Sequence, residues 1–125
     1  MNDEHGLQAL GTTGAKFQGL ETFAAPDEVT CVKLCSDEVT SLCPVTNQPD
    51  WYTVTVEYKP RERCVESKTF KLYIQSFRDR GLFCERFAQQ VLEDLCAALD
   101  PWAIKVQVTQ KPRGGVAIEA TAARS

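Results

Sequence analysis

Two stretches of the chain alternate between polar and apolar residues, which is the two-residue period of a strand with one buried face. Residues 28–35 alternate through Val29, Cys31 and Leu34, and we expect a strand there. Residues 51–58 alternate strictly and are rich in β-branched and aromatic side chains, so they predict a second strand. A polar loop with two prolines, residues 43–50, lies between the two strands.

From Ser67 onward the period changes to that of a helix. Phe70, Ile74 and Phe77 stand at i, i+4 and i+7, which places them on one helical face. Ser67 is a suitable N-cap, and Gly81 is expected to end this helix. A second helix is predicted where apolar residues recur at four-residue steps, at positions 87, 91, 95 and 99, before an Asp-Pro pair at 100–101.

Two further strands are expected at residues 103–110 and 116–121, joined by a turn at Gly114 and Gly115. The predicted order is therefore strand, strand, helix, helix, strand, strand. This order favours an α+β domain, an antiparallel four-stranded sheet with two helices between strands 2 and 3. We expect a flexible N-terminal arm at residues 1–22 and a single domain at residues 23–125. Free sheet edges favour association into a homo-oligomer.

Composition narrows the class of protein. The 125 residues are 43% hydrophobic and 25% charged, as in an ordinary globular domain. A net charge of -3 and a pI near 5.2 argue against nucleic-acid binding by charge alone. The apolar stretches are too short to cross a membrane, and the N-terminus lacks the features of a signal peptide, so we expect a cytoplasmic protein.

Six cysteines stand at positions 31, 35, 43, 64, 84 and 96. Without an export signal, a disulfide framework is not expected. Cys31 and Cys35 have the spacing of half a zinc site, but the chain has a single histidine, His5, and no second close cysteine pair. We therefore expect no metal, and the usual role of such a cysteine is that of a small buried apolar residue.

Cys43 is different because it lies in the polar loop, seven residues before Asp50. A reactive cysteine must be a thiolate in an accessible position with a proton acceptor or positive charge nearby. An acidic residue across a short loop can fold back to that distance. From spacing alone, an inert loop cysteine remains the alternative.

The start of the first predicted helix carries Lys68 and Lys71, on the face opposite the apolar stripe. Unpaired backbone N–H groups at a helix N-terminus attract anions, so these lysines are candidates for binding phosphate. A solvated helix face is the simpler interpretation. Two other segments, Phe83-Cys84-Glu85 and Arg113-Gly114-Gly115, could bind a base edge and a phosphate, or could be ordinary turns.

Taken together, these segments resemble one family. Residues 43–50, CPVTNQPD, resemble the nucleophile loop of the short-form 7-cyano-7-deazaguanine reductases of the QueF type. Residues 66–73, ESKTFKLY, match that family's signature octapeptide. The similarity extends over about residues 28–122. It implies the tunnelling fold (T-fold), whose subunits assemble into an oligomeric barrel with active sites between subunits.

The resemblance also implies roles for individual residues. Cys43 would attack the nitrile carbon of 7-cyano-7-deazaguanine to form a covalent thioimide, and Asp50 would act as the proton donor. Two molecules of NADPH would then reduce this species to 7-aminomethyl-7-deazaguanine in queuosine biosynthesis. A nitrile is a poor hydride acceptor, and thiolate addition converts it to a more reducible C=N group.

Binding residues are implied in the same way. The guanine-like edge would be held by Glu66, Ser67 and Glu85, with Phe83 packed against the base. The NADPH phosphates would be met by three basic residues, Lys68, Lys71 and Arg113.

One position departs from the family pattern. Cys84 stands where the family has a catalytic histidine, so the resemblance implies slow proton transfer and leaves a weakly active base-binding variant as an alternative. A second alternative is the related amidinotransferase branch that acts on the same nitrile in tRNA to form archaeosine. That branch lacks the NADPH octapeptide, which is intact here, so we favour the reductase.

Overall fold

The computed structural model describes residues 17–125. Residues 1–16 of the expected arm, with His5, lie outside the described residues. The elements are, in chain order, β1 (Thr22–Ala24), β2 (Val32–Leu42), β3 (Pro49–Lys59), β4 (Arg63–Val65), α1 (Ser67–Gln75), the 3₁₀ helix η1 (Ser76–Asp79), α2 (Cys84–Leu99), β5 (Ala103–Arg113) and β6 (Val116–Arg124).

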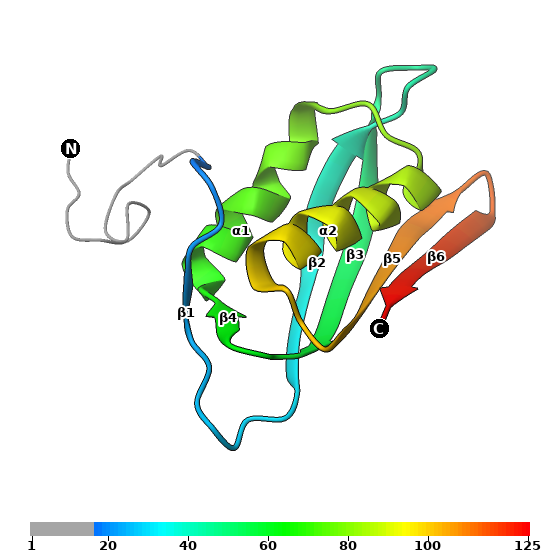
Figure 1. Ribbon diagram of the computed structural model, residues 1–125. Coiled ribbons are helices and arrows are strands. Elements are labelled where there is room, and N and C mark those ends of the chain that lie inside the picture. Colours follow the sequence, from blue (N-terminus) through cyan, green and yellow to red (C-terminus); the bar gives the residue numbers. More distant parts are fainter. Residues whose placement is uncertain (1–16) are drawn as a thin grey trace.

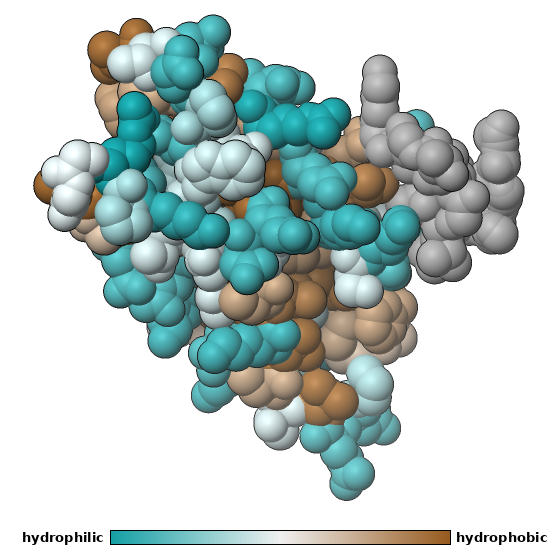
Figure 2. All heavy atoms as spheres, turned by 180° about the vertical axis from the view of Figure 1, so that it is seen from behind, coloured by the Kyte–Doolittle hydropathy of each residue, from teal (hydrophilic) through white to brown (hydrophobic). Residues whose placement is uncertain are grey.

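The main sheet is antiparallel and has the strand order β2-β3-β5-β6. Both helices lie on one of its faces, and the short strands β1 and β4 form a separate pair beside α1 (Figure 1). The α+β class and the two helices between the second and third strands of this sheet confirm the expectation from the sequence. Seen from behind the helices, much of the surface is hydrophilic (Figure 2).

Alternation along β3 explains how the core is built. Every second residue from Asp50 to Tyr58 is buried, and these side chains face the helices, while the residues between them are more exposed. The helices contribute the complementary stripes, with Phe70, Ile74 and Phe77 from one and the residues at 87, 91, 95 and 99 from the other, all buried. Burying one such large apolar side chain contributes roughly 1.5–3 kcal/mol.

The ends of three elements differ from the expectation. The first main strand is Val32–Leu42, not residues 28–35, because a bulge between Ser36 and Val39 interrupts the alternation that marks a strand. Residue 67 is not the N-cap of α1. Glu66 is the N-cap, and its longer side chain accepts hydrogen bonds from the backbone N–H groups of Lys68 and Thr69. The helix ends at Gln75 and continues as a 3₁₀ turn to Asp79, short of Gly81.

The end of α2 follows the expectation. Asp100 adopts the left-handed conformation, with φ of 44°, and its N–H donates to the carbonyl of Cys96 at 2.9 Å. Pro101 then prevents continuation of the helix. Among residues 17–125, no helix is long and apolar enough to cross a membrane.

Candidate active site

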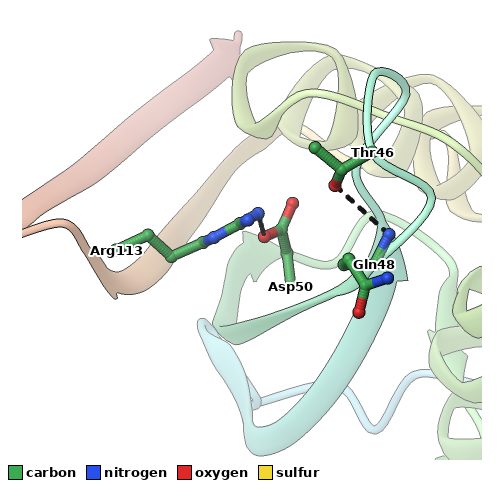
Figure 3. A network of polar contacts seen from close by, with 4 residues as sticks. All are labelled: Thr46, Gln48, Asp50 and Arg113. Atoms are coloured by element: carbon green, nitrogen blue, oxygen red, sulfur yellow. Dashed lines mark hydrogen bonds and ion pairs between the residues drawn. The ribbon is translucent and has the colours of Figure 1, made fainter.

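The loop between β2 and β3 holds Cys43 in a tight turn. The Cys43 N–H donates to the Gln48 carbonyl at 2.8 Å, and the Asn47 N–H donates to the Cys43 carbonyl at 2.8 Å. Asn47 has a φ of 59°, which asparagine tolerates better than most residues. The Gln48 N–H donates to the Thr46 hydroxyl at 3.3 Å (Figure 3). These bonds fix the cysteine at the end of β2.

A second set of backbone bonds ties this loop to the segment between the helices. The Leu42 N–H donates to the Arg80 carbonyl at 2.9 Å, and the Leu82 N–H donates to the Leu42 carbonyl at 3.2 Å. The residue before Cys43 is therefore bound to the chain that leads into Phe83 and Cys84. Two segments that are far apart in sequence meet at one end of the sheet.

The Cys43 thiol is set up to ionise near neutral pH. Its pKa is lowered to about 7, chiefly because the thiolate accepts hydrogen bonds from the hydroxyl and backbone N–H of Thr46 and from the N–H of Val45. Partial burial acts in the opposite direction, and the Arg113 side chain adds a smaller lowering effect. A half-exposed thiol with such a pKa has the properties of a nucleophile.

Asp50 is paired with Arg113, whose side chain also contacts the Cys43 thiol. Oδ1 of the buried carboxylate accepts a hydrogen bond from Nη1 of the guanidinium, which reaches it from the end of β5 (Figure 3). The ion pair raises the pKa of Arg113. The structure thus brings together Cys43, Asp50 and Arg113, whereas the sequence suggested a phosphate-binding role for the arginine.

Cys84 is buried and turned away from the loop. Its side chain is 1% exposed, and its Sγ lies 3.4 Å from the Val108 carbonyl and 3.9 Å from the Ile118 carbonyl. Burial raises the pKa of this thiol, and the neighbouring Glu85 adds to the effect. At neutral pH Cys84 is therefore a neutral donor to backbone carbonyls.

The two neighbours of Cys84 face solvent. Phe83 is 57% exposed, and Glu85 is exposed in the first turn of α2. Both side chains are available to an incoming ligand or to a second copy of the chain.

The start of α1 is an already capped helix end. Glu66 accepts the N–H groups of Lys68 and Thr69 through its two carboxylate oxygens, each at 2.8 Å. These backbone groups are therefore not free to bind a phosphate. In the part of the chain that the structure describes, neither Lys68 nor Lys71 forms an ion pair, and Ser67 is exposed.

The two halves of the expected site lie at opposite ends of the sheet. Cys43 and Asp50 lie at the β2–β3 loop, whereas Glu66 and the two lysines follow β4 at the other end (Figure 1). The 11 residues of β3 that separate the two ends span roughly 35 Å. One subunit therefore brings together Cys43 and Asp50 but places the start of α1 at the other end of the sheet.

Sequence reasoning missed two buried polar groups next to Asp50, the hydroxyls of Ser41 and Tyr52. Tyr52 is two residues after Asp50 on the same strand, so the alternation of the strand predicts that both side chains point to the same face. The face to which Ser41 points could not be predicted from sequence, because the bulge in β2 shifts the alternation before this residue. Among the described residues, no group of three His, Cys, Asp or Glu side chains is arranged to hold a metal.

Alkylation should report the ionisation of Cys43. We expect its reaction with iodoacetamide to reach half its maximal rate near pH 7, because only the thiolate reacts. Thr46→Val removes the largest cause of the lowered pKa, and an increase of one unit from 7 cuts the thiolate fraction at pH 7 about fivefold. Arg113→Ala should act in the same direction but less. Peptide mass spectrometry measures the rate at each pH.

Cys31 provides the internal control in the same digest. Burial, and then the Glu57 carboxylate 3.5 Å from its Sγ, raise the pKa of Cys31. Its alkylation at pH 7 should therefore be much slower than that of Cys43. Half-maximal alkylation of Cys43 near pH 9, or no change in Thr46→Val, would contradict this account of the loop.

The fold and site define an α+β domain in which a loop cysteine of lowered pKa and a buried carboxylate share the Arg113 side chain. A model of the family described as QueF-like protein matches residues 49–125. The NADPH-dependent 7-cyano-7-deazaguanine reductase of Desulfovibrio desulfuricans is 48% identical over 121 residues, which cover 90% of this chain and 72% of that protein. The reductase of the same name from Frankia casuarinae is 40% identical, with 92% and 93% covered. The chain belongs to the QueF-like family.

A solved structure is also similar. The apo form of the archaeosine synthase QueF-Like matches with a TM-score of 0.72 and 33% sequence identity. The match covers 76% of this chain and 93% of that one. The activities named for these relatives are the reductase that the sequence favours and the archaeosine branch that it keeps as one alternative.

Proposed function

We propose that this protein is an NADPH-dependent reductase that converts the nitrile of 7-cyano-7-deazaguanine to an aminomethyl group in queuosine biosynthesis. The observation that carries this proposal is the thiol of Cys43, with its pKa near 7, beside the buried Asp50 carboxylate. The names of the relatives from Desulfovibrio desulfuricans and Frankia casuarinae supply the substrate and the cofactor.

The first step is covalent capture of the nitrile. The Cys43 thiolate forms a C–S bond to the nitrile carbon, one π bond of the nitrile breaks, and its electron pair goes to nitrogen. The Asp50 carboxylate accepts the proton that the Cys43 thiol loses and passes it to that nitrogen, which gives a neutral thioimide. Arg113 lies between the two groups and stabilises negative charge on either of them.

Bound NADPH supplies the hydride for each of the two reductions. The residues that fit its phosphates are Lys68 and Lys71, which form no ion pair within residues 17–125 and so can be neutralised by an anion. They act as side chains only, because Glu66 occupies the backbone N–H groups at this helix start. Arg113 is a third candidate once a bound ligand competes with Asp50.

The guanine-like edge of the substrate would be held by acceptors from both ends of the sheet. Glu85 is exposed and available, and Phe83 presents an open aromatic face for stacking. Each carboxylate oxygen of Glu66 accepts one backbone N–H and retains a free acceptor position, so Glu66 can also accept from the base, next to Ser67.

A closed homo-oligomer would complete the site. The start of α1 follows β4 and the Cys43 loop follows β2, at opposite ends of the sheet within one chain, so a single subunit would not enclose the substrate. The outer edges of β2 and β6 have no partner strand among the described residues. Pairing along such edges would build the tunnelling-fold barrel and place α1 of one subunit beside the Cys43 loop of the next.

Archaeosine formation is the second candidate, favoured by the likeness to the archaeosine synthase structure. The two are separated by following the reduced-nicotinamide absorbance of purified protein mixed with NADPH and 7-cyano-7-deazaguanine. We expect two NADPH oxidised for each product formed. Incorporation of ammonia into nitrile-bearing tRNA, with no loss of that absorbance, would show that the protein is an archaeosine synthase and not a reductase.

The lysines of α1 should control cofactor binding. Lys68→Ala or Lys71→Ala is expected to raise the KM for NADPH about tenfold, since one charge-assisted contact to phosphate contributes roughly 1.5 kcal/mol or more. The KM for the base should change little. Lys105→Ala, on β5, is the matched control. Equal effects on the two KM values would argue against a phosphate role.

Mixed oligomers test whether the site is shared between chains. Co-expression of Cys43→Ala with the Lys68→Ala/Lys71→Ala double variant should give more turnover at low NADPH than the two proteins contribute separately. In a shared site, one chain supplies the cysteine and its neighbour the lysines. Activity equal to the weighted sum of the separate proteins would locate each site within one chain.

A further inference from the structure

Two hydroxyl groups are buried beneath the Cys43 loop without partners. The side chains of Ser41 and Tyr52 are both 0% exposed, and neither hydroxyl has a hydrogen-bond partner of ordinary geometry among the described residues. Buried polar groups nearly always have partners, and the exceptions concentrate where a side chain has a functional role. The pair therefore requires an explanation.

The register of the sheet places both groups next to Asp50. Ser41 on β2 is directly opposite Asp50 on β3, and residues paired in this way point to the same face. Tyr52 is two residues after Asp50, so it also points to that face. The bulge between Ser36 and Val39 is what turns Ser41 inward. All three side chains lie on the helix-facing side of the sheet.

The ring of Tyr52 lies under the first turns of α2. It packs edge-on against Phe87, with ring centroids 5.0 Å apart, and Phe87 is three residues after Cys84. Burial raises the pKa of Tyr52, while the nearby Ser41 hydroxyl lowers it to a smaller degree. Negative charge on Asp50 adds to the increase, with smaller contributions from Cys84 and Cys43. Tyr52 is therefore a neutral O–H donor at physiological pH, close to the reacting groups.

Cys84 does not offer such a donor. Its thiol is directed to the backbone carbonyls of Val108 and Ile118, and a thiol is a weak donor in any case. Asp50 can accept further hydrogen bonds, because a carboxylate has about four acceptor positions and Arg113 is bonded to one oxygen. In ligand-free enzymes, catalytic hydrogen bonds are often long and shorten only when substrate binds.

We propose that Tyr52, supported by Ser41, is a positioning residue that donates a hydrogen bond to Asp50 during reduction of the nitrile. This inference rests on the proposed reductase function. When Asp50 gives its proton to the reacting nitrogen, an N–H bond forms and negative charge returns to the carboxylate. The phenol then stabilises that charge and orients the carboxylate, while the O–H bond of Tyr52 stays intact.

Tyr52→Phe separates this role from packing. The ring contact with Phe87 is kept, and an unsatisfied buried hydroxyl is removed, so Tm should stay equal to that of the native protein or rise. The kcat for NADPH oxidation with 7-cyano-7-deazaguanine should fall about tenfold to a hundredfold, the value of one hydrogen bond to a charged group. The KM for the base should change less than twofold, because the Tyr52 hydroxyl is proposed to act on Asp50 and not to bind the base. Ser41→Ala should lower kcat less.

Tyr58→Phe is the matched control on the same strand and face. Its hydroxyl accepts the Val65 N–H at 3.0 Å, far from Cys43, so this variant should lose stability and keep its kcat. A Tyr52→Phe protein with native kcat would overturn the positioning role while leaving the reductase function intact. A Tyr52→Phe protein that loses both thermal stability and kcat would also overturn it, because that result indicates a packing effect. A native protein that does not oxidise NADPH with this substrate would overturn both proposals.

Discussion

Replacing Cys43 with alanine is expected to abolish covalent capture of 7-cyano-7-deazaguanine and to lower turnover by more than about a thousandfold. No other described cysteine combines partial exposure, a lowered pKa and a neighbouring carboxylate. Intact-mass spectrometry of the protein mixed with substrate, without NADPH, should show one added ligand for the native chain and none for the variant.

Cys31→Ala is the matched control for that loss. Cys31 is exposed as a residue. Its pKa is nevertheless raised, first by partial desolvation of the thiol and then by the neighbouring Glu57 carboxylate. The variant should form the adduct at the native rate. An adduct that persists in Cys43→Ala would assign the nucleophile to another residue and remove the basis of the mechanism.

Asp50→Asn is expected to slow capture of the nitrile as well as its turnover. Asparagine has no proton to give to the reacting nitrogen, and general acid–base assistance is typically worth about 10²–10⁴-fold in rate, so kcat should fall by that amount. The adduct should still form, but more slowly, because the Arg113 charge remains to stabilise the Cys43 thiolate while the nitrogen must take its proton from water. Single-turnover kinetics would measure the two steps separately.

The fold should tolerate this change. Arg113 has a side chain that is 44% exposed, so its guanidinium can be solvated when the ion pair is lost. Asp27→Asn, at an exposed position in the turn after β1, is the control. A variant at position 50 that reduces the nitrile at the native rate would show that the proton comes from elsewhere.

The secondary structure was predictable wherever the pattern is regular. β3, β5 and α2 carry uninterrupted periods of two or of nearly four residues, and each lies where that period predicts it. β2 was misplaced because its bulge inserts an extra residue and reverses the parity after Ser36. The strands β1 and β4 have three residues each, which is too few to show a period.

The candidate site, like the fold, could be predicted from the sequence only in part. Cys43 and Asp50 could be paired from sequence because both lie in or next to one short loop. The contact of Arg113 with Asp50 spans 63 residues and depends on the order of β3 and β5 in the sheet, which local pattern does not reveal. The capping role of Glu66 was missed because serine, the next residue, is the more common cap.

The most direct test of the central claim is a chase of the covalent adduct. The native protein is first incubated with 7-cyano-7-deazaguanine, freed from unbound ligand and weighed by intact-mass spectrometry, and NADPH is then added. We expect the mass to increase by one ligand and then to return to that of the free protein, with two NADPH consumed and one aminomethyl product released per adduct. An adduct that remains after NADPH is added, or product formed without any adduct, would contradict the account.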